Sequence, residues 1–196
     1  MWNSNHFRIE ITPGFFLLIV MAWYFDREVK VIPWAIIACV VHELGHVVAV
    51  LFMKGRIRGL KLSAVGVEMH LEHGSVLSYG AENVIALAGP FANLVMAVFA
   101  YVLRGWIPAV ISVVVGGFNL LPVLPLDGGR VIYNVLSSYF ESSWPERTMT
   151  VIAGVFTGML LGAGLIGIVV YGNISLLLTS GWLLLKNMQN QGKKGK

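Results

Sequence analysis

The chain has 196 residues, of which 57% are hydrophobic and only 12% are charged. A typical soluble domain is about a quarter charged, so this composition excludes a water-soluble globule and a disordered chain. The net charge of +4 comes from few residues, and we attribute it to orientation in a membrane. We therefore expect no nucleic-acid partner.

Long apolar runs predict the architecture. A helix needs about 20 apolar residues to cross a bilayer, and helices satisfy their own backbone polar groups in lipid. The final run is long enough for two spans with a turn at Tyr171-Gly172-Asn173. We expect an all-α polytopic membrane protein with about six transmembrane helices. Residues 1–190 would form one domain, and 191–196 a basic, disordered tail. The runs are Ile11–Phe25, Val31–Met53, Asn83–Leu103, Gly105–Leu126 and Thr148–Leu185.

Two short segments alternate between apolar and polar residues. They are Phe7–Ile11 and Val65–Glu72. A period of two is typical of a half-buried strand. The sequence thus predicts a small membrane-associated β-sheet at the cytosolic face.

Basic residues predict the orientation. They are concentrated between the second and third apolar runs, from Lys54 to Lys61, and in the C-terminal tail. Because basic residues are enriched in cytoplasmic loops, we expect both termini in the cytosol and Arg27, Lys30 and Arg104 outside. The protein would be a multi-pass protein of the cell membrane with the lipid bilayer as a partner.

The second apolar run contains an H-E-x-x-H motif, His42-Glu43-Leu44-Gly45-His46. Residues four apart share one face of a helix, so both imidazoles can bind one Zn²⁺. Glu43 could then accept a proton from a zinc-bound water. Ionisable groups inside a membrane span cost free energy and indicate function. The alternative is a hydrogen-bonded cluster that packs helices.

A catalytic zinc site needs a third protein ligand. Asp127 ends a run that enters the cytosolic side of the membrane, at a depth similar to that of the histidines. Prolines and glycines around it predict a break in the helix. Asp127 could instead be a helix cap. A rival ligand set comprises Glu68, His70, Glu72 and His73, of which the first three share one face of the second predicted strand. The alternation favours the wet face of an amphipathic strand for them, from which they could still contact substrate.

Three motifs in order resemble the site-2 protease family of intramembrane zinc metalloproteases. They are the H-E-x-x-H, the G-P-x-x-N at Gly89–Asn93, and the N-x-x-P-x-x-P-L-D-G-G that begins at Asn119. The resemblance covers about Phe7 to Tyr133. It implies a protease that cuts transmembrane substrates near the cytosolic face.

The resemblance also implies residue roles. His42, His46 and Asp127 match the zinc ligands, and Glu43 matches the catalytic base. Asn119 matches a residue that contacts substrate or stabilises the transition state. Further candidate substrate contacts are Asn93, Pro125, Glu68 and His70.

Within the family, compactness and the segment Gly66–Gly74 are similar to the sporulation branch, which processes a sigma-factor precursor. That branch usually carries a C-terminal CBS domain, which does not follow here, and this weakens the sporulation assignment. The implied partners are a membrane-tethered protein substrate and a regulatory membrane protein. Two alternatives are a membrane zinc sensor or carrier, and a catalytically silent member that binds a partner.

Overall fold

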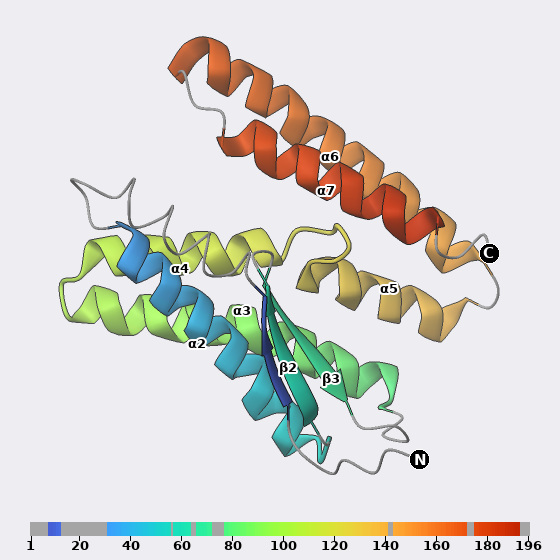
Figure 1. The fold of residues 1–196 in the computed structure, drawn as a ribbon, viewed down its shortest axis with the longest axis horizontal. Helices are drawn as coiled ribbons and strands as arrows, with labels where there is room; N and C mark the ends of the chain where they lie inside the picture. Colours follow the sequence, from blue (N-terminus) through green and yellow to red (C-terminus); the bar gives the residue numbers. More distant parts are fainter. Residues whose placement is uncertain are drawn as a thin grey trace. The chain divides into compact units, whose positions relative to one another are not determined.

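The computed structural model describes residues 8–12, 31–55, 57–63, 66–71, 77–140, 143–171 and 175–192. These residues contain six helices and three strands (Figure 1). In chain order the elements are β1 (Arg8–Ile11), α2 (Val31–Phe52), β2 (Ile57–Ser63), β3 (Gly66–Leu71), α3 (Tyr79–Val102), α4 (Trp106–Asn119), α5 (Asp127–Tyr139), α6 (Trp144–Tyr171) and α7 (Ser175–Gly192).

The chain divides into two compact units, Met1–Gly116 and Gly117–Lys196. The first unit contains a sheet in the order β1-β2-β3, in which β1 is parallel to β2 and β3 is antiparallel to it. The β2–β3 register aligns Lys61 with Glu68 and Ser63 with Gly66. Strands β1 and β3 lie within the two alternating segments of the sequence, whereas β2, between them in the sheet, was not predicted. Their place at the cytosolic face stays a prediction.

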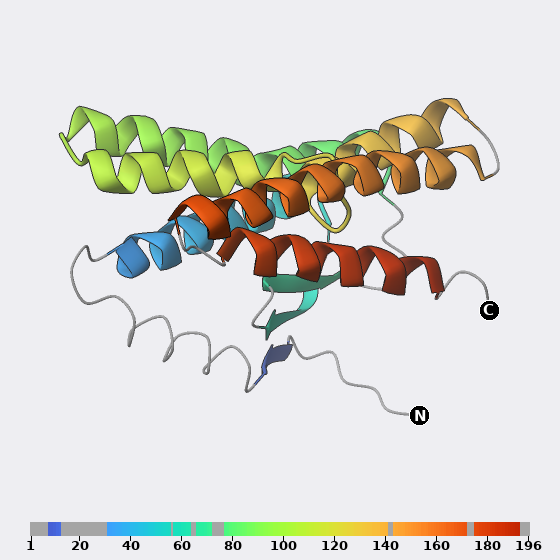
Figure 2. The same ribbon diagram turned by 90° about the horizontal axis from the view of Figure 1, so that it is seen from above.

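Helices α2 and α3 pack side by side in the first unit (Figures 1 and 2). Ser78 caps α3 by accepting a hydrogen bond from the backbone N–H of Ala81 over 3.2 Å, which satisfies one of the open donors of the first turn. A stripe of buried residues along α3 alternates by three and four positions, which is the spacing of one helix face. The stripe comprises Ala86, Pro90, Asn93, Ala97 and Ala100.

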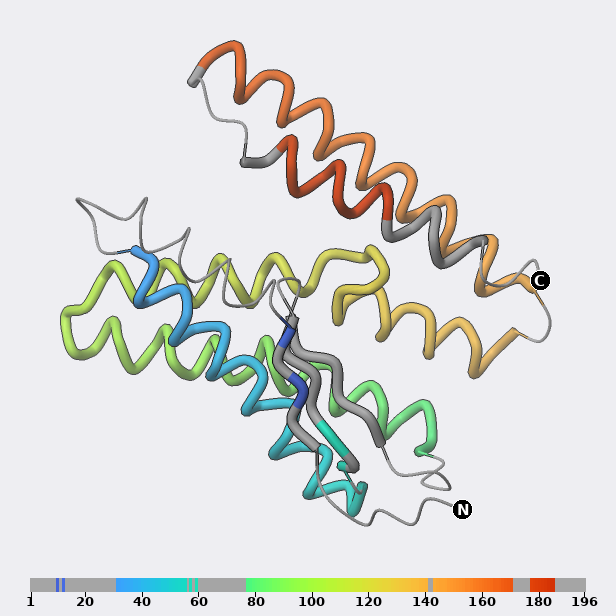
Figure 3. The backbone as a smooth tube through the Cα atoms, viewed as in Figure 1, coloured from blue at the N-terminus to red at the C-terminus, as the bar shows by residue number. Residues whose placement is uncertain are grey.

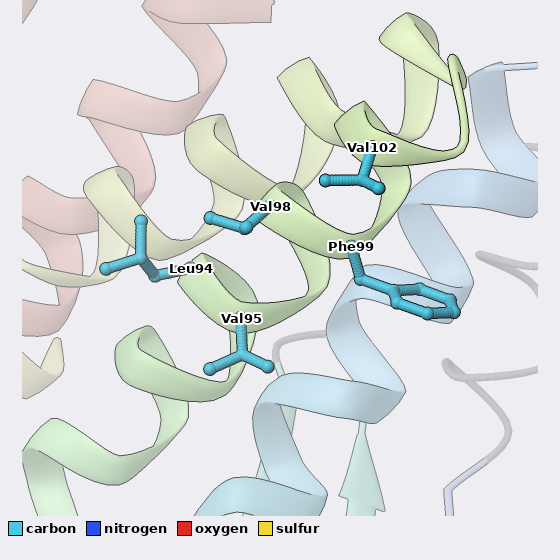
Figure 4. A pocket seen from close by; sticks show the side chains of 5 residues that line it. All are labelled: Leu94, Val95, Val98, Phe99 and Val102. Carbon is cyan, nitrogen blue, oxygen red and sulfur yellow. The ribbon is translucent and has the colours of Figure 1, made fainter.

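The outward face of α3 is apolar. Its side chains form a shallow groove (Figure 4) and are more than half exposed. An apolar face of this size is costly in water and is typical of a helix in contact with lipid. The residues are Leu94, Val95, Val98, Phe99 and Val102.

The second unit contains the antiparallel pair α6 and α7, with α5 against α6 (Figure 2). Its core comprises Val123, Leu126, Ala153 and Leu183. Val123 and Leu126 come from the non-helical segment 120–126, whose course between α4 and α5 can be followed in Figure 3. That segment is therefore held by burial of its own apolar side chains.

Three of the described helices are long and apolar enough to cross a membrane: α2, α3 and α6. The protein is thus a membrane protein with several apolar helices. The predicted span Gly105–Leu126 is wrong in length, because α4 ends at Asn119 after 14 residues. Pro122 and Pro125 cannot donate backbone hydrogen bonds and prevent the helix from continuing.

Two other expectations concern the ends of the chain. Of the predicted first span, only Ile11 and Thr12 are described, and Ile11 belongs to β1. Helix α7 continues to Gly192, so the predicted tail is helical at Gln191 and Gly192, and residues 193–196 lie outside the described residues. The prediction of one domain over residues 1–190 stays a prediction.

Candidate metal centre

His42 and His46 lie one turn apart on α2 and are both buried. Their Nε2 atoms are 3.1 Å apart, and the ring planes meet at 87°. A zinc ion with Zn–N bonds of 2.0–2.1 Å and tetrahedral angles holds two nitrogens about 3.3 Å apart. The two imidazoles are therefore spaced as two ligands of one ion.

The opposite nitrogen of His46 defines its tautomer. Nδ1 lies 2.7 Å from the backbone carbonyl oxygen of Ile85 on α3. A carbonyl oxygen can only accept, so Nδ1 carries the proton and donates it. The lone pair of the neutral ring is then on Nε2, the atom that faces His42.

Nδ1 of His42 contacts the side-chain amide of Asn93, also on α3, at 3.2 Å. Asn93 is fully buried. The two histidines of α2 are thus each held by α3, one through a main-chain oxygen and one through a side-chain amide. Such outer contacts orient metal-ligating histidines in known sites.

Asp127 provides the third group. It is buried and is the first residue of α5. One ligand atom each from His42, His46 and Asp127 lie within 4.8 Å of one another. Two imidazole nitrogens and one carboxylate oxygen in a buried place suit Zn²⁺, and three protein ligands leave a tetrahedral ion one position for water. The residues present therefore fit zinc.

Glycines permit the close packing around these residues. A Cβ on Gly89 would collide with Nε2 and Cε1 of His46 and lie 2.9 Å from Cε1 of His42. A Cβ on Gly45 would lie 2.5 Å from the carbonyl oxygen of Ala88. Both positions need glycine because α2 and α3 approach each other there.

Glycines also follow Asp127. A Cβ on Gly128 would collide with the carbonyl oxygen of Leu120, and one on Gly129 would lie 2.6 Å from that of Val123. The segment 120–126 therefore folds back against the first turn of α5. This packing holds the backbone at Asp127.

The other predicted site residues occupy different places. Glu43 is half-buried on α2 beside the histidines, Asn119 is the half-buried last residue of α4, and Pro125 is half-buried in the segment that follows. Glu68 and His70 belong to β3, and their side chains lie outside the described part of the structure. The rival ligand set stays a prediction for the same reason, since Glu72 and His73 are also outside the described residues.

Comparison with known proteins shows which families and folds the chain resembles. The model of peptidase family M50 matches residues 104–163. The solved structure of a site-2 protease from Methanocaldococcus jannaschii is similar with a TM-score of 0.70, over 96% of this chain and 93% of that one, at 20% identity. The chain is therefore similar to peptidase family M50 over this segment and to a site-2 protease in its fold. The M50 family model spans the segment that contains Asn119, Pro125 and Asp127, and the fold is that of a site-2 protease.

The chain is also similar to several curated proteins, two of which are named as zinc metalloproteases. A zinc metalloprotease of M. jannaschii is 23% identical over 190 residues, 88% of this chain and 54% of that protein. Stage IV sporulation protein FB of Bacillus subtilis is 24% identical over 150 residues, 69% of this chain and 50% of that protein. A putative zinc metalloprotease of Campylobacter jejuni is 33% identical over 79 residues, 40% of this chain and 21% of that protein.

Two points follow from these matches. The chain spans about half, or less, of the length of these relatives. The sporulation protein matches at an identity close to that of the archaeal enzyme, so the comparisons do not single out the sporulation branch.

The sequence analysis did not identify two groups that position the histidines, the backbone carbonyl of Ile85 and Gly89. The carbonyl of Ile85 has no side-chain signature, so no motif could reveal it. Gly89 was noted only as part of the G-P-x-x-N element, although its spacing of four from Asn93 places both on one face of α3. This shared face was the sequence feature from which the role of Gly89 beside the histidines could have been predicted.

Proposed function

We propose that the protein is an intramembrane zinc metalloendopeptidase. The observation that carries the proposal is the pair of Nε2 atoms 3.1 Å apart, with the Nδ1 atom of each ring engaged by α3. Two neutral rings in these tautomers direct two lone pairs at one point, and such lone pairs repel each other unless a cation lies between them. Asp127 adds an anionic oxygen to this group.

Zinc, when bound, would polarise the scissile carbonyl and lower the pKa of a water molecule, so that this water loses a proton readily and becomes a good nucleophile. His42, His46 and Asp127 would hold the ion. Glu43 follows His42 on α2, takes the proton of the attacking water and passes it to the leaving amine. Asn119 donates a hydrogen bond to the developing oxyanion, and Pro125 shapes the loop that carries Asp127.

The substrate is a membrane-tethered protein cut in or near its transmembrane segment. A helix hides its peptide bonds, so the substrate must be extended where it is cut. In the described sheet β3 pairs with β2 on one side, and its other edge can accept an extended strand. Glu68 and His70 of β3 would then lie along the substrate, and Asn93 acts nearer the metal.

The cleavage releases a signalling protein from the membrane, with both termini of the protease in the cytosol. A sigma-factor precursor of sporulation is one substrate of this kind. A regulatory membrane protein that controls access to the site is the expected partner.

The test compares wild type with Glu43→Gln in the membranes of expressing cells. The substitution keeps the size of the side chain and removes the base. General-base catalysis contributes about 10²–10⁴-fold, so cleavage should fall by at least about 100-fold. Mass spectrometry of new protein N-termini in the membrane fraction measures it, and zinc content in the purified variant should stay at the wild-type value.

Equal sets of new N-termini in both samples would contradict the proposal. Zinc that is bound equally well, with no cleavage by either protein, would favour the sensor or carrier, or the silent partner-binding member.

A further inference from the structure

We propose that Asn93 is a positioning residue, which selects the tautomer of His42 and thereby presents its Nε2 to the metal. This inference rests on the proposed function. It replaces the substrate contact expected for Asn93 with a role behind a metal ligand.

The environment of Asn93 is the first argument. Its side chain has no exposed surface and lies on the stripe of α3 that faces α2. Buried amides are costly unless their donors and acceptors are paired. Every partner of this amide is therefore energetically significant.

One orientation of the amide satisfies its neighbours. Nδ2 then donates to the carbonyl oxygen of Ala38 over 2.9 Å. Oδ1 accepts from Nδ1 of His42 over 3.2 Å and from the backbone N–H of Gly116 over 3.3 Å. The opposite orientation would set Oδ1 against a carbonyl oxygen and the NH₂ group against an N–H. Because amide nitrogen and oxygen are assigned from such networks, the first orientation is the one that the neighbours require.

This orientation determines the proton on His42. Oδ1 can only accept, so Nδ1 of His42 carries the proton and Nε2 keeps its lone pair toward Nε2 of His46. The carbonyl oxygen of Ala38 stabilises this orientation of the amide, because it accepts a hydrogen bond from the NH₂ group and so leaves Oδ1 facing the ring of His42. Asn93 thus connects the backbone carbonyl of Ala38 on α2 to the imidazole of His42, one turn later on the same helix, through two hydrogen bonds.

Helix α4 supports the amide from the other side. A Cβ on Gly116 would lie 3.1 Å from Cβ of Asn93 and 3.4 Å from the carbonyl oxygen of Pro90. Gly116 therefore lets the α4 backbone reach the amide and donate to it. On Gly117, the next residue, a Cβ would meet nothing within 4 Å.

A merely structural role is the competing explanation, and Ser112 is the matched control for it. Ser112 is also fully buried in the first unit, and its hydroxyl donates to the carbonyl oxygen of Pro108 over 2.8 Å. Ser112→Ala removes a buried hydrogen bond without touching either histidine. It therefore measures how zinc affinity responds to the loss of a buried hydrogen bond that does not involve the histidines.

The experiment measures zinc affinity of the full chain in detergent by competition with a chromophoric chelator. Asn93→Leu removes donor and acceptor, and should weaken zinc binding by about 10–100-fold, as losses of outer-shell partners do. Asn93→Asp keeps an acceptor for His42 in either protonation state and should restore affinity to within about 3-fold of wild type. Ser112→Ala should stay within the same 3-fold.

A spectroscopic readout separates tautomer selection from general destabilisation. In protein labelled with ¹⁵N-histidine and loaded with zinc, wild type should show His42 protonated at Nδ1 and metal-bound at Nε2. Asn93→Leu should lose that Nδ1–H signal, and Asn93→Asp should keep it.

A second pair of variants covers the case in which Asn93→Leu does not fold. Gly116→Ala should weaken zinc binding, because its Cβ displaces Asn93, and Gly117→Ala should not. Alanine has a higher helix propensity than glycine at both positions, so a loss of zinc in Gly116→Ala alone cannot come from a weaker helix.

Two outcomes overturn the inference. If wild type binds zinc and Asn93→Leu binds it as tightly, with the His42 signal unchanged, Asn93 does not position His42 and the proposed protease stands. If wild type binds no zinc, the proposed function fails, and the inference fails with it.

Discussion

At the scale of single residues, the two histidines of the motif are held in different ways. Nδ1 of His46 donates to a backbone carbonyl, which no side-chain substitution can remove. Nδ1 of His42 depends on the amide of Asn93. The hydrogen bond behind His42 can therefore be removed by a side-chain substitution at Asn93, whereas the one behind His46 cannot be removed in this way.

Removal of the carboxylate of Asp127 should lower zinc affinity. Asp127→Ala takes away a proposed direct ligand, so the loss should exceed the roughly 10–100-fold that follows loss of an outer-shell partner. Zinc per chain in the detergent-purified protein, measured beside wild type, checks this. Full retention of zinc would mean that Asp127 is not a ligand and would direct attention to Glu68, His70 and His73.

At the scale of elements, the site depends on how closely α3 approaches α2. Gly45 and Gly89 stand at the contact, and a Cβ on either would collide with atoms of the facing helix. A second element-scale feature is the non-helical segment 120–126, which folds back on Gly128 and Gly129 and begins α5 at Asp127. Substitution of these glycines should therefore displace the proposed metal ligands without changing the ligand side chains themselves.

Gly89→Ala tests the close approach. Its Cβ would occupy the space of the imidazole of His46, and overpacking of this kind costs about 1–3 kcal/mol. We expect zinc affinity and thermal stability to fall together. Gly80→Ala on the same helix is the control, because its Cβ would meet only Oγ of Ser78 at 3.9 Å. Zinc affinities within about 3-fold for the two variants would show that the rings have room to move.

At the scale of the whole molecule, the apolar surface is the dominant feature. Three of the described helices are long enough to span a bilayer, and the outward side chains of α3 are apolar and largely exposed. Exposed apolar side chains of this kind are favourable in contact with lipid and unfavourable in contact with water. The sequence adds an orientation through its basic residues, and that orientation is open to a direct test.

The orientation test uses single cysteines. Cys39, the one native cysteine, is replaced by serine, and Lys54→Cys or Arg104→Cys is added at exposed positions after α2 and α3. Because basic residues around Lys54 favour the cytosol, Lys54→Cys should react with an impermeant maleimide only in inside-out membrane vesicles. Arg104→Cys should react only in right-side-out vesicles. The reverse pattern would contradict cytosolic termini.

The sequence by itself determined the membrane class, the pairing of His42 and His46 and the helix break before Asp127. Each follows from local physics: apolar length, four-residue spacing on a helix, and prolines that lack a donor. Only the tertiary structure decided that the carbonyl of Ile85 lies behind His46 and the amide of Asn93 behind His42. These depend on the rotation and axial offset of α3 against α2. Apolar packing between membrane helices is non-directional, so hydrophobic periodicity does not encode that offset, and the glycines and buried amide at the contact define it instead.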